Sequence, residues 1–118
     1  MIRIVPATRE MIEGLQGVPV QKWQRAIAAV EGDRVLGAAG YYLLPGKIVA
    51  WLIAGPEIRS HPRLIVRGGR MLLEWFRQRG LPVFAVCDKR EATAPKFLEH
   101  WGFVPFGDEL YVWQGDRT

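Results

Sequence analysis

Three arginines and two adjacent glycines lie within one short stretch of the chain, and their types suit the binding of an anion. Arg63, Arg67 and Arg70 can donate charge-assisted hydrogen bonds to phosphate oxygens. Gly68 and Gly69 would allow backbone N–H groups to approach the same oxygens, and the N-terminus of a following helix would add partial positive charge. The stretch therefore predicts a basic turn that binds a phosphorylated ligand.

The same spacing also fits a helix. In that interpretation the glycines allow close packing, and the arginines share one solvated helix face: Arg59, Arg63, Arg67 and Arg70. The sequence alone leaves both interpretations open.

Few other side chains suit catalysis. Glu57 follows the apolar stretch Ile48–Ala54 and could take a proton through water, although a solvated turn carboxylate is the alternative. Cys87 ends a second apolar stretch and is expected to be a buried, inert thiol. His61 is expected in a loop and His100 near a helix end, and one Cys with two His lacks the spacing of a metal site.

The composition is that of an ordinary globular protein. With 118 residues, 49% apolar and 24% charged, the chain is expected to form a single domain over residues 1–118. A single Cys excludes an internal disulfide framework and fits a reducing compartment. No stretch approaches the roughly 20 apolar residues that span a membrane, so we expect a cytoplasmic protein without membrane contact. The net charge of +4 is compatible with an anionic partner but does not identify one.

Periodicity predicts a mixed sheet. Strands are expected at Ile2–Ile4, Arg25–Val30, Arg34–Leu43, Lys47–Ala54, Val83–Val86, Phe103–Phe106 and Leu110–Trp113. Helices are expected after the N-cap Thr8, from Gly69 to Gly80, and from Thr93 to Trp101. The second helix would connect two parallel strands by a right-handed crossover, and the other strands would be antiparallel. The expected fold is α/β, with a mixed, mostly antiparallel twisted sheet of about six or seven strands flanked by helices.

In element order the chain resembles the GNAT family, the Gcn5-related N-acetyltransferases. The resemblance is most specific at Pro56–Glu57, at Arg70–Glu74 and at Ala94–Phe103, which ends in Gly-Phe as a helix of the family does. It implies a GNAT-like fold with acetyl-CoA between the strands Ile48–Ala54 and Val83–Val86. It further implies direct transfer of the acetyl group to an amine.

The resemblance also assigns roles to residues. A backbone N–H on the strand before Pro56 would polarise the thioester carbonyl. The cofactor-binding residues would be Ile53, Ala54, Gly55, Arg63, Arg67, Gly68, Gly69 and Arg70. Leu98 stands where the family commonly has a general-acid Tyr, and Glu91 where it often has Asn. Tyr111 is therefore the candidate for protonating the leaving thiolate, with Tyr42, Cys87 and water as alternatives.

The departures from the family pattern keep other functions open. The family's loop reads Gln/Arg-x-x-Gly-x-Gly/Ala, and neither register of the basic stretch completes it. The same fold could serve as a non-catalytic binding or structural protein, for example a phage or accessory protein. Five Trp among many Arg could indicate a nucleic-acid binder, but no nucleic-acid motif accompanies them. As partners we expect a small-molecule amine or a protein amino group, and a homodimer could form at the edge of the final hairpin.

Overall fold

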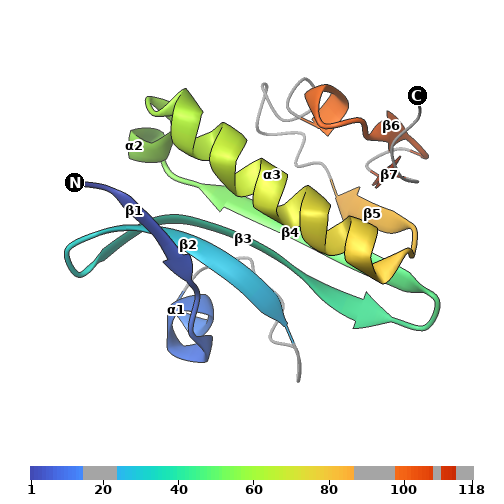
Figure 1. Ribbon diagram of the computed structural model, residues 1–118, viewed down its shortest axis with the longest axis horizontal. Helices are drawn as coiled ribbons and strands as arrows, with labels where there is room; N and C mark the ends of the chain where they lie inside the picture. Colours follow the sequence, from blue (N-terminus) through green and yellow to red (C-terminus); the bar gives the residue numbers. More distant parts are fainter. Residues whose placement is uncertain (15–23, 87–97, 108–109, 114–118) are drawn as a thin grey trace.

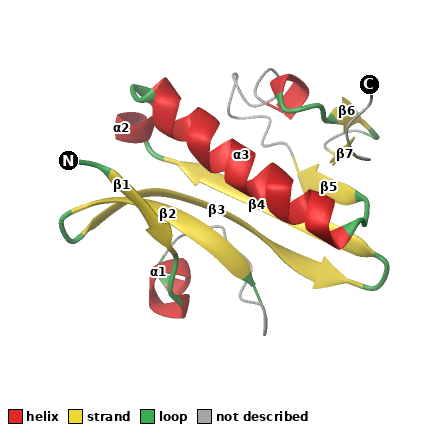
Figure 2. Ribbon diagram, viewed as in Figure 1, coloured by secondary structure: helices red, strands yellow, loops and turns green. Residues whose placement is uncertain are grey.

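The described part of the chain folds into a seven-stranded sheet with helices on both faces (Figure 1). The computed structural model describes residues 1–14, 24–86, 98–107 and 110–113. Its strands are β1 Arg3–Pro6, β2 Arg25–Glu31, β3 Arg34–Leu44, β4 Lys47–Ala54, β5 Val83–Val86, β6 Val104–Pro105 and β7 Leu110–Trp113. Its helices are α1 Arg9–Glu13, α2 Pro56–Arg59 and α3 Pro62–Arg79 (Figure 2). The predicted α/β fold is confirmed.

The first half of the sheet is an antiparallel meander whose turns were readable from the sequence. Gly32 and Gly46 take positive φ angles of 60° and 73°, which glycine adopts without steric cost, in the β2–β3 and β3–β4 turns. Thr8 caps α1, because its hydroxyl accepts a hydrogen bond from the Met11 N–H at 3.2 Å. These local features fix the antiparallel order β1-β2-β3-β4.

The second half of the sheet contains the predicted parallel pair. β4 and β5 are parallel and are joined through α2 and α3, and β7 then pairs antiparallel with β5. β6 lies at the edge beyond β7, so the strand order is β1-β2-β3-β4-β5-β7-β6. The final hairpin is confirmed, with β6 shorter than expected. Of the helix predicted up to Trp101, residues 98–100 are helical, and the part before them lies outside the described residues.

Two clusters of apolar residues hold the helices to the sheet. On the face covered by α3, the buried cluster contains Tyr41, Ile48, Leu73, Phe76, Val83, Ala85, Phe103 and Trp113. On the opposite face a smaller cluster forms around Ala28, Val30 and Ala38, against which Met11 of α1 and Trp51 of β4 pack. α3 therefore has the larger share of the core. In the described part of the chain, no helix is long and apolar enough to cross a membrane.

The predicted basic turn is wrong, because the residues from Pro62 onward already belong to α3. Pro62 occupies the first helical turn, where its missing N–H costs no hydrogen bond. Gly68 and Gly69 lie inside the helix, where each costs about 1 kcal/mol relative to alanine. Close packing offsets this cost. A Cβ at Gly68 would lie 3.3 Å from Ile27, and one at Gly69 would lie 2.4 Å from the ring of Trp101. The alternative interpretation, a helix face with glycines for close packing, is confirmed for Arg63, Arg67 and Arg70, whereas Arg59 ends the separate helix α2.

These contacts predict opposite effects for two neighbouring substitutions. Gly69→Ala forces a methyl group into the rigid indole of Trp101, so we expect it to lower the free energy of unfolding by about 1–3 kcal/mol. Gly68→Ala gains the same helix propensity and meets only the flexible ends of Ile27 and Ile4, so it should be neutral or slightly stabilising. Urea unfolding of both variants measures the difference. Equal stability of the two variants would show that Trp101 does not constrain α3.

Candidate functional site

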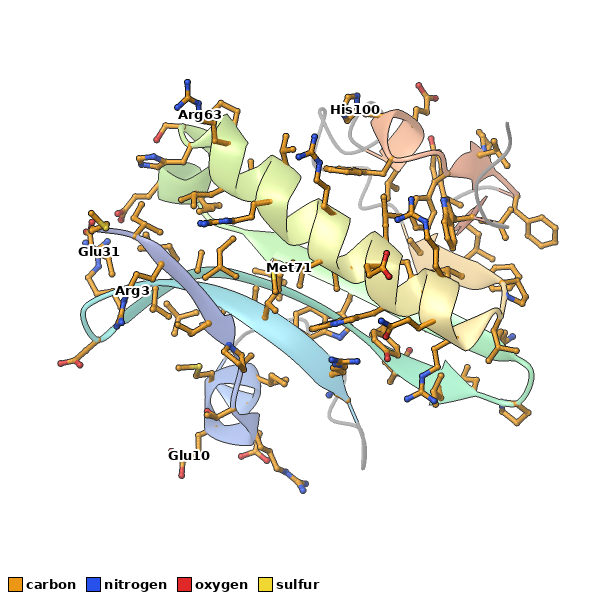
Figure 3. All side chains as sticks on the ribbon, in the orientation of Figure 1. Arg3, Glu10, Glu31, Arg63, Met71 and His100 are labelled. Atoms are coloured by element: carbon orange, nitrogen blue, oxygen red, sulfur yellow. The ribbon has the colours of Figure 1, made fainter. Side chains whose placement is uncertain are left out.

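A groove with three arginines runs along the first half of α3. Its volume is about 590 Å³, and it is lined by Pro62, Arg63, Val66, Arg67, Arg70 and Met71. Every one of these residues belongs to α3, and Figure 3 marks the groove by the labelled side chains of Arg63 and Met71. The sequence interpretation had identified the arginines but not the apolar residues between them.

The arginines are spaced to act together. Arg63, Arg67 and Arg70 are exposed and lie four and three residues apart, so they share one side of the helix over about 10 Å. Within the described residues, none of the three forms an ion pair. Guanidinium groups without carboxylate partners, set beside Val66 and Met71, suit a ligand with phosphate groups and an apolar body.

The two glycines do not take part in the way the sequence suggested. Gly68 and Gly69 lie beyond the first turn of α3, where backbone N–H groups bond to carbonyls four residues earlier. Those N–H groups are not available to phosphate oxygens. Cofactor binding by Gly68 and Gly69 stays a prediction, but the free donors on which it depended are absent from the helix.

The described pairing of the two parallel strands stops next to the groove. Its last described pair is Ala50–Ala85, whereas β4 continues to Ala54 and remains paired with β3. Because β4 points toward α2 and the start of α3, the diverging part of the strand and the groove lie at the same end of the molecule (Figure 1). Open α/β sheets commonly bind ligands at the carboxyl ends of their strands.

The peptide groups of β4 alternate between its two neighbours, and this alternation shows which of them face the divergence. The Ile48 N–H donates to the Pro82 carbonyl at 2.9 Å, and the Gly55 N–H donates to the Leu36 carbonyl of β3 at 3.1 Å. The even-numbered peptide groups of the strand therefore face β5, and those of Leu52 and Ala54 lie beyond the last described pair.

The N–H groups of the cofactor-binding residues predicted at the end of β4 therefore point in two directions. Ala54 turns its N–H toward the divergence, whereas Ile53 and Gly55 turn theirs toward β3. Leu52 was missed by the sequence interpretation. Its side chain is 50% exposed, although it lies in the middle of an apolar stretch. The alternation of peptide directions, counted from the Gly55 turn, was the signal that could have found it.

The two candidate catalytic side chains are held in different places. Glu57 is exposed in the first turn of α2 and forms an ion pair with Arg34 at the start of β3. Tyr111 lies on β7 opposite Ala85 and packs against the cluster under α3. Ala85 in turn lies opposite Ala50, seven positions before Glu57 in the sequence. The strand register therefore separates Glu57 from Tyr111, and the solvated carboxylate considered for Glu57 is what the structure shows.

The structure also describes the surroundings of three other residues that the sequence analysis considered. His61 is the exposed N-cap residue of α3, and His100 packs edge-on against Trp101 with ring centroids 5.4 Å apart. Leu98 packs against the α3 cluster. Cys87 and Glu91 lie outside the described residues. Among the residues that the structure describes, no group of three His, Cys, Asp or Glu side chains is arranged to hold a metal ion.

Comparison with known proteins finds likeness in structure only. No protein-family profile matches the sequence, and no curated protein is similar to it in sequence. Among solved structures, the chain is similar to a protein from Desulfovibrio desulfuricans described as a GNAT-family acetyltransferase, with a TM-score of 0.68 and 16% identity over 97% of this chain and 99% of that one.

Two further solved structures have acceptors in their names. A variant of the spermidine N-acetyltransferase from Vibrio cholerae has a TM-score of 0.67 and 10% identity over 95% of this chain and 92% of that one. The ribosomal-protein-S18-alanine N-acetyltransferase from Escherichia coli has a TM-score of 0.65 and 11% identity over 95% of this chain and 91% of that one. The chain therefore has the fold of the GNAT acetyltransferases, and the resemblance read from the sequence is confirmed at the level of the fold.

The Arg34–Glu57 ion pair is expected to contribute little to stability. Both side chains are more than half exposed, so solvent screens their attraction. A double-mutant cycle with Arg34→Gln and Glu57→Gln should give a coupling free energy below about 1 kcal/mol in urea unfolding. The exposed Arg9–Glu13 pair of α1, at 2.9 Å, is a matched control and should give a similar value. A coupling above about 2 kcal/mol would mean that the pair is far better shielded than its exposure indicates.

Proposed function

We propose that this protein is an acetyl-CoA-dependent N-acetyltransferase that transfers an acetyl group to an amine by direct attack. The observation that supports this most is the position of the arginine groove. It lies at the start of α3, beside the point where β4 and β5 diverge, on a fold shared with GNAT acetyltransferases. Cations for phosphate groups and strand peptides that face away from β3 then occur at one end of the molecule.

Each part of the site has a role in this proposal. Arg63, Arg67 and Arg70 bind the phosphates of CoA, while Val66 and Met71 contact less polar parts of the cofactor. The N–H groups of Leu52 and Ala54, which face the divergence, donate to the thioester oxygen and stabilise its developing negative charge. Bound acetyl-CoA supplies the acetyl group as an activated thioester.

The transfer requires two proton movements. The amine nitrogen forms the new C–N bond as the C–S bond breaks, the amine loses a proton, and the thiolate must gain one. Glu57 is exposed to water and takes the amine proton through a water molecule in this proposal. Tyr111 protonates the thiolate.

The acceptor is a small-molecule amine or a protein amino group. The fold does not choose between them, since its solved neighbours include a spermidine N-acetyltransferase and an alanine N-acetyltransferase of a ribosomal protein. We further propose that the protein works in the cytoplasm, where acetyl-CoA is available and a single Cys would stay reduced.

A second candidate is a binding protein of the same fold that lacks catalysis. Two observations favour it: Glu57 is engaged by Arg34, and Tyr111 packs against the core cluster. Both candidates retain the cofactor groove, so acetyl-CoA binding alone does not distinguish them. Catalytic release of free CoA thiol distinguishes them.

Cofactor binding is expected to depend on Arg67. Arg67→Glu places a negative charge among the groove residues, so it should weaken acetyl-CoA binding at least about tenfold, measured by calorimetric titration. Arg3→Glu, on the exposed strand β1, makes the same change in net charge away from the groove and should bind acetyl-CoA like the parent protein. Unchanged affinity of Arg67→Glu would remove the groove from the proposal.

Catalysis is expected to depend on Glu57. With an amine that supports release of free CoA thiol, Glu57→Gln should lower kcat by about 10²-fold or more, because the general base is lost. Its affinity for acetyl-CoA should not change, since the side chain lies outside the groove. If no amine in a broad panel gives thiol release while acetyl-CoA binds, the non-catalytic candidate is correct.

A further inference from the structure

A second cationic surface lies on the side of α3 that faces β2. Trp75 of α3 and Arg25 of β2 form its centre, with the Arg25 guanidinium 4.0 Å from the centre of the Trp75 ring. The Arg79 side chain donates from Nε to the Tyr41 hydroxyl at 3.4 Å, and the Tyr41 and Trp75 rings lie 6.1 Å apart. Two guanidinium groups are thus held against one set of aromatic rings.

The strand register and the helix spacing fix this arrangement. Arg25 lies directly opposite Tyr41 in the β2–β3 ladder. Gly68, Met71 and Trp75 lie three and four residues apart and share one side of α3, the side on which Gly68 meets Ile27 of β2. Met71 is 38% exposed and precedes Trp75 by four residues, so an apolar side chain lies one helical turn from Trp75 on the same side of α3.

The charge of Arg25 is available to a partner. Arg25 is exposed, and among the described residues no carboxylate forms an ion pair with it. Glu74, the nearest acidic residue in the α3 sequence, is paired with Arg77 instead. Stacking on an indole restricts the guanidinium and leaves its N–H groups directed outward in the plane, ready for a carboxylate or phosphate.

We propose that the surface formed by Arg25, Met71, Trp75 and Arg79 docks an acidic polypeptide segment. A carboxylate matches the fork of N–H donors on a stacked guanidinium, and Met71 adds a contact for an apolar side chain of the same segment. A nucleic acid fits less well, since the Arg25 guanidinium occupies the place over Trp75 that a stacked base would need. Trp, Arg and Met are also the residue types that protein interfaces favour.

The surface meets the cofactor groove at Met71, but its arginines lie apart from those of the groove. Arg79 follows Arg70, the nearest groove arginine in the sequence, by nine residues, which corresponds to about 14 Å along the helix axis. This distance exceeds the screening length of about 8 Å at physiological ionic strength, so the two groups of arginines act independently. The docking of an acidic segment therefore does not depend on the proposed acetyl transfer.

The test is fluorescence anisotropy with a fluorescein-labelled peptide of glutamate and leucine. The same peptide with glutamine in place of glutamate is the uncharged control, and a single-stranded oligonucleotide of equal net charge is the competing class. Only the acidic peptide is expected to bind, and Arg25→Glu should weaken it about tenfold or more. Arg25→Lys, which keeps the charge but loses the planar fork, should weaken it by about threefold or more.

Arg67→Glu supplies the matched control in the groove. It should leave peptide affinity within about twofold, while Arg25→Glu should leave acetyl-CoA affinity unchanged. Failure of acetyl-CoA binding in the parent protein would affect only the proposed enzyme function.

Several results would overturn the docking surface. These are absence of peptide binding, equal losses for Arg25→Glu and Arg67→Glu, and full affinity in Arg25→Lys. Tighter binding of the oligonucleotide that also depends on Arg25 would instead assign the surface to nucleic acid.

Discussion

The close approach of α3 to its surroundings at two glycines is the constraint on which the rest of the structure depends. Gly68 lets the helix backbone settle against Ile27 of β2, and Gly69 accommodates the indole of Trp101 on a neighbouring side. With a larger side chain at Gly69 the helix or the Trp101 ring would have to move, and Leu73 and Phe76 would lose part of their burial. The rotation of α3 that these contacts fix also turns Arg63, Arg67 and Arg70 outward.

The second constraint is the path of the chain out of β4. The last described β4–β5 pair contains Ala50, while β4 continues along β3 to Ala54. The chain then leaves β4 through α2 and enters α3 directly, so the arginine groove follows the end of β4 both in sequence and in space. The chemistry of the candidate site therefore follows from connectivity.

Local patterns were sufficient for most of the fold but not for the site. Lys47–Ala54 and Val83–Val86 could be predicted to the residue, because apolar runs between glycine- and proline-containing turns define them. The start of α3 could not, since Gly68 and Gly69 suggest a turn until their contacts with Ile27 and Trp101 are known. The Arg34–Glu57 pair joins residues 23 positions apart, and no periodicity signals it. Leu52 could not be identified from the sequence for a similar reason, because its 50% exposure depends on packing with residues distant in the sequence.

One helix carries both cationic surfaces, and they meet at Met71. Residues three and four apart share a side of α3, so Met71 adjoins Arg67 in the groove and Trp75 on the side that faces β2. The groove arginines have exposed, solvated side chains, which suits a ligand that must be exchanged. Arg25 is instead stacked on an aromatic ring, which lowers the conformational entropy lost on binding and suits a surface that recognises shape as well as charge. Arginine is thus suited to two kinds of binding, depending on whether its side chain is solvated or stacked on an aromatic ring.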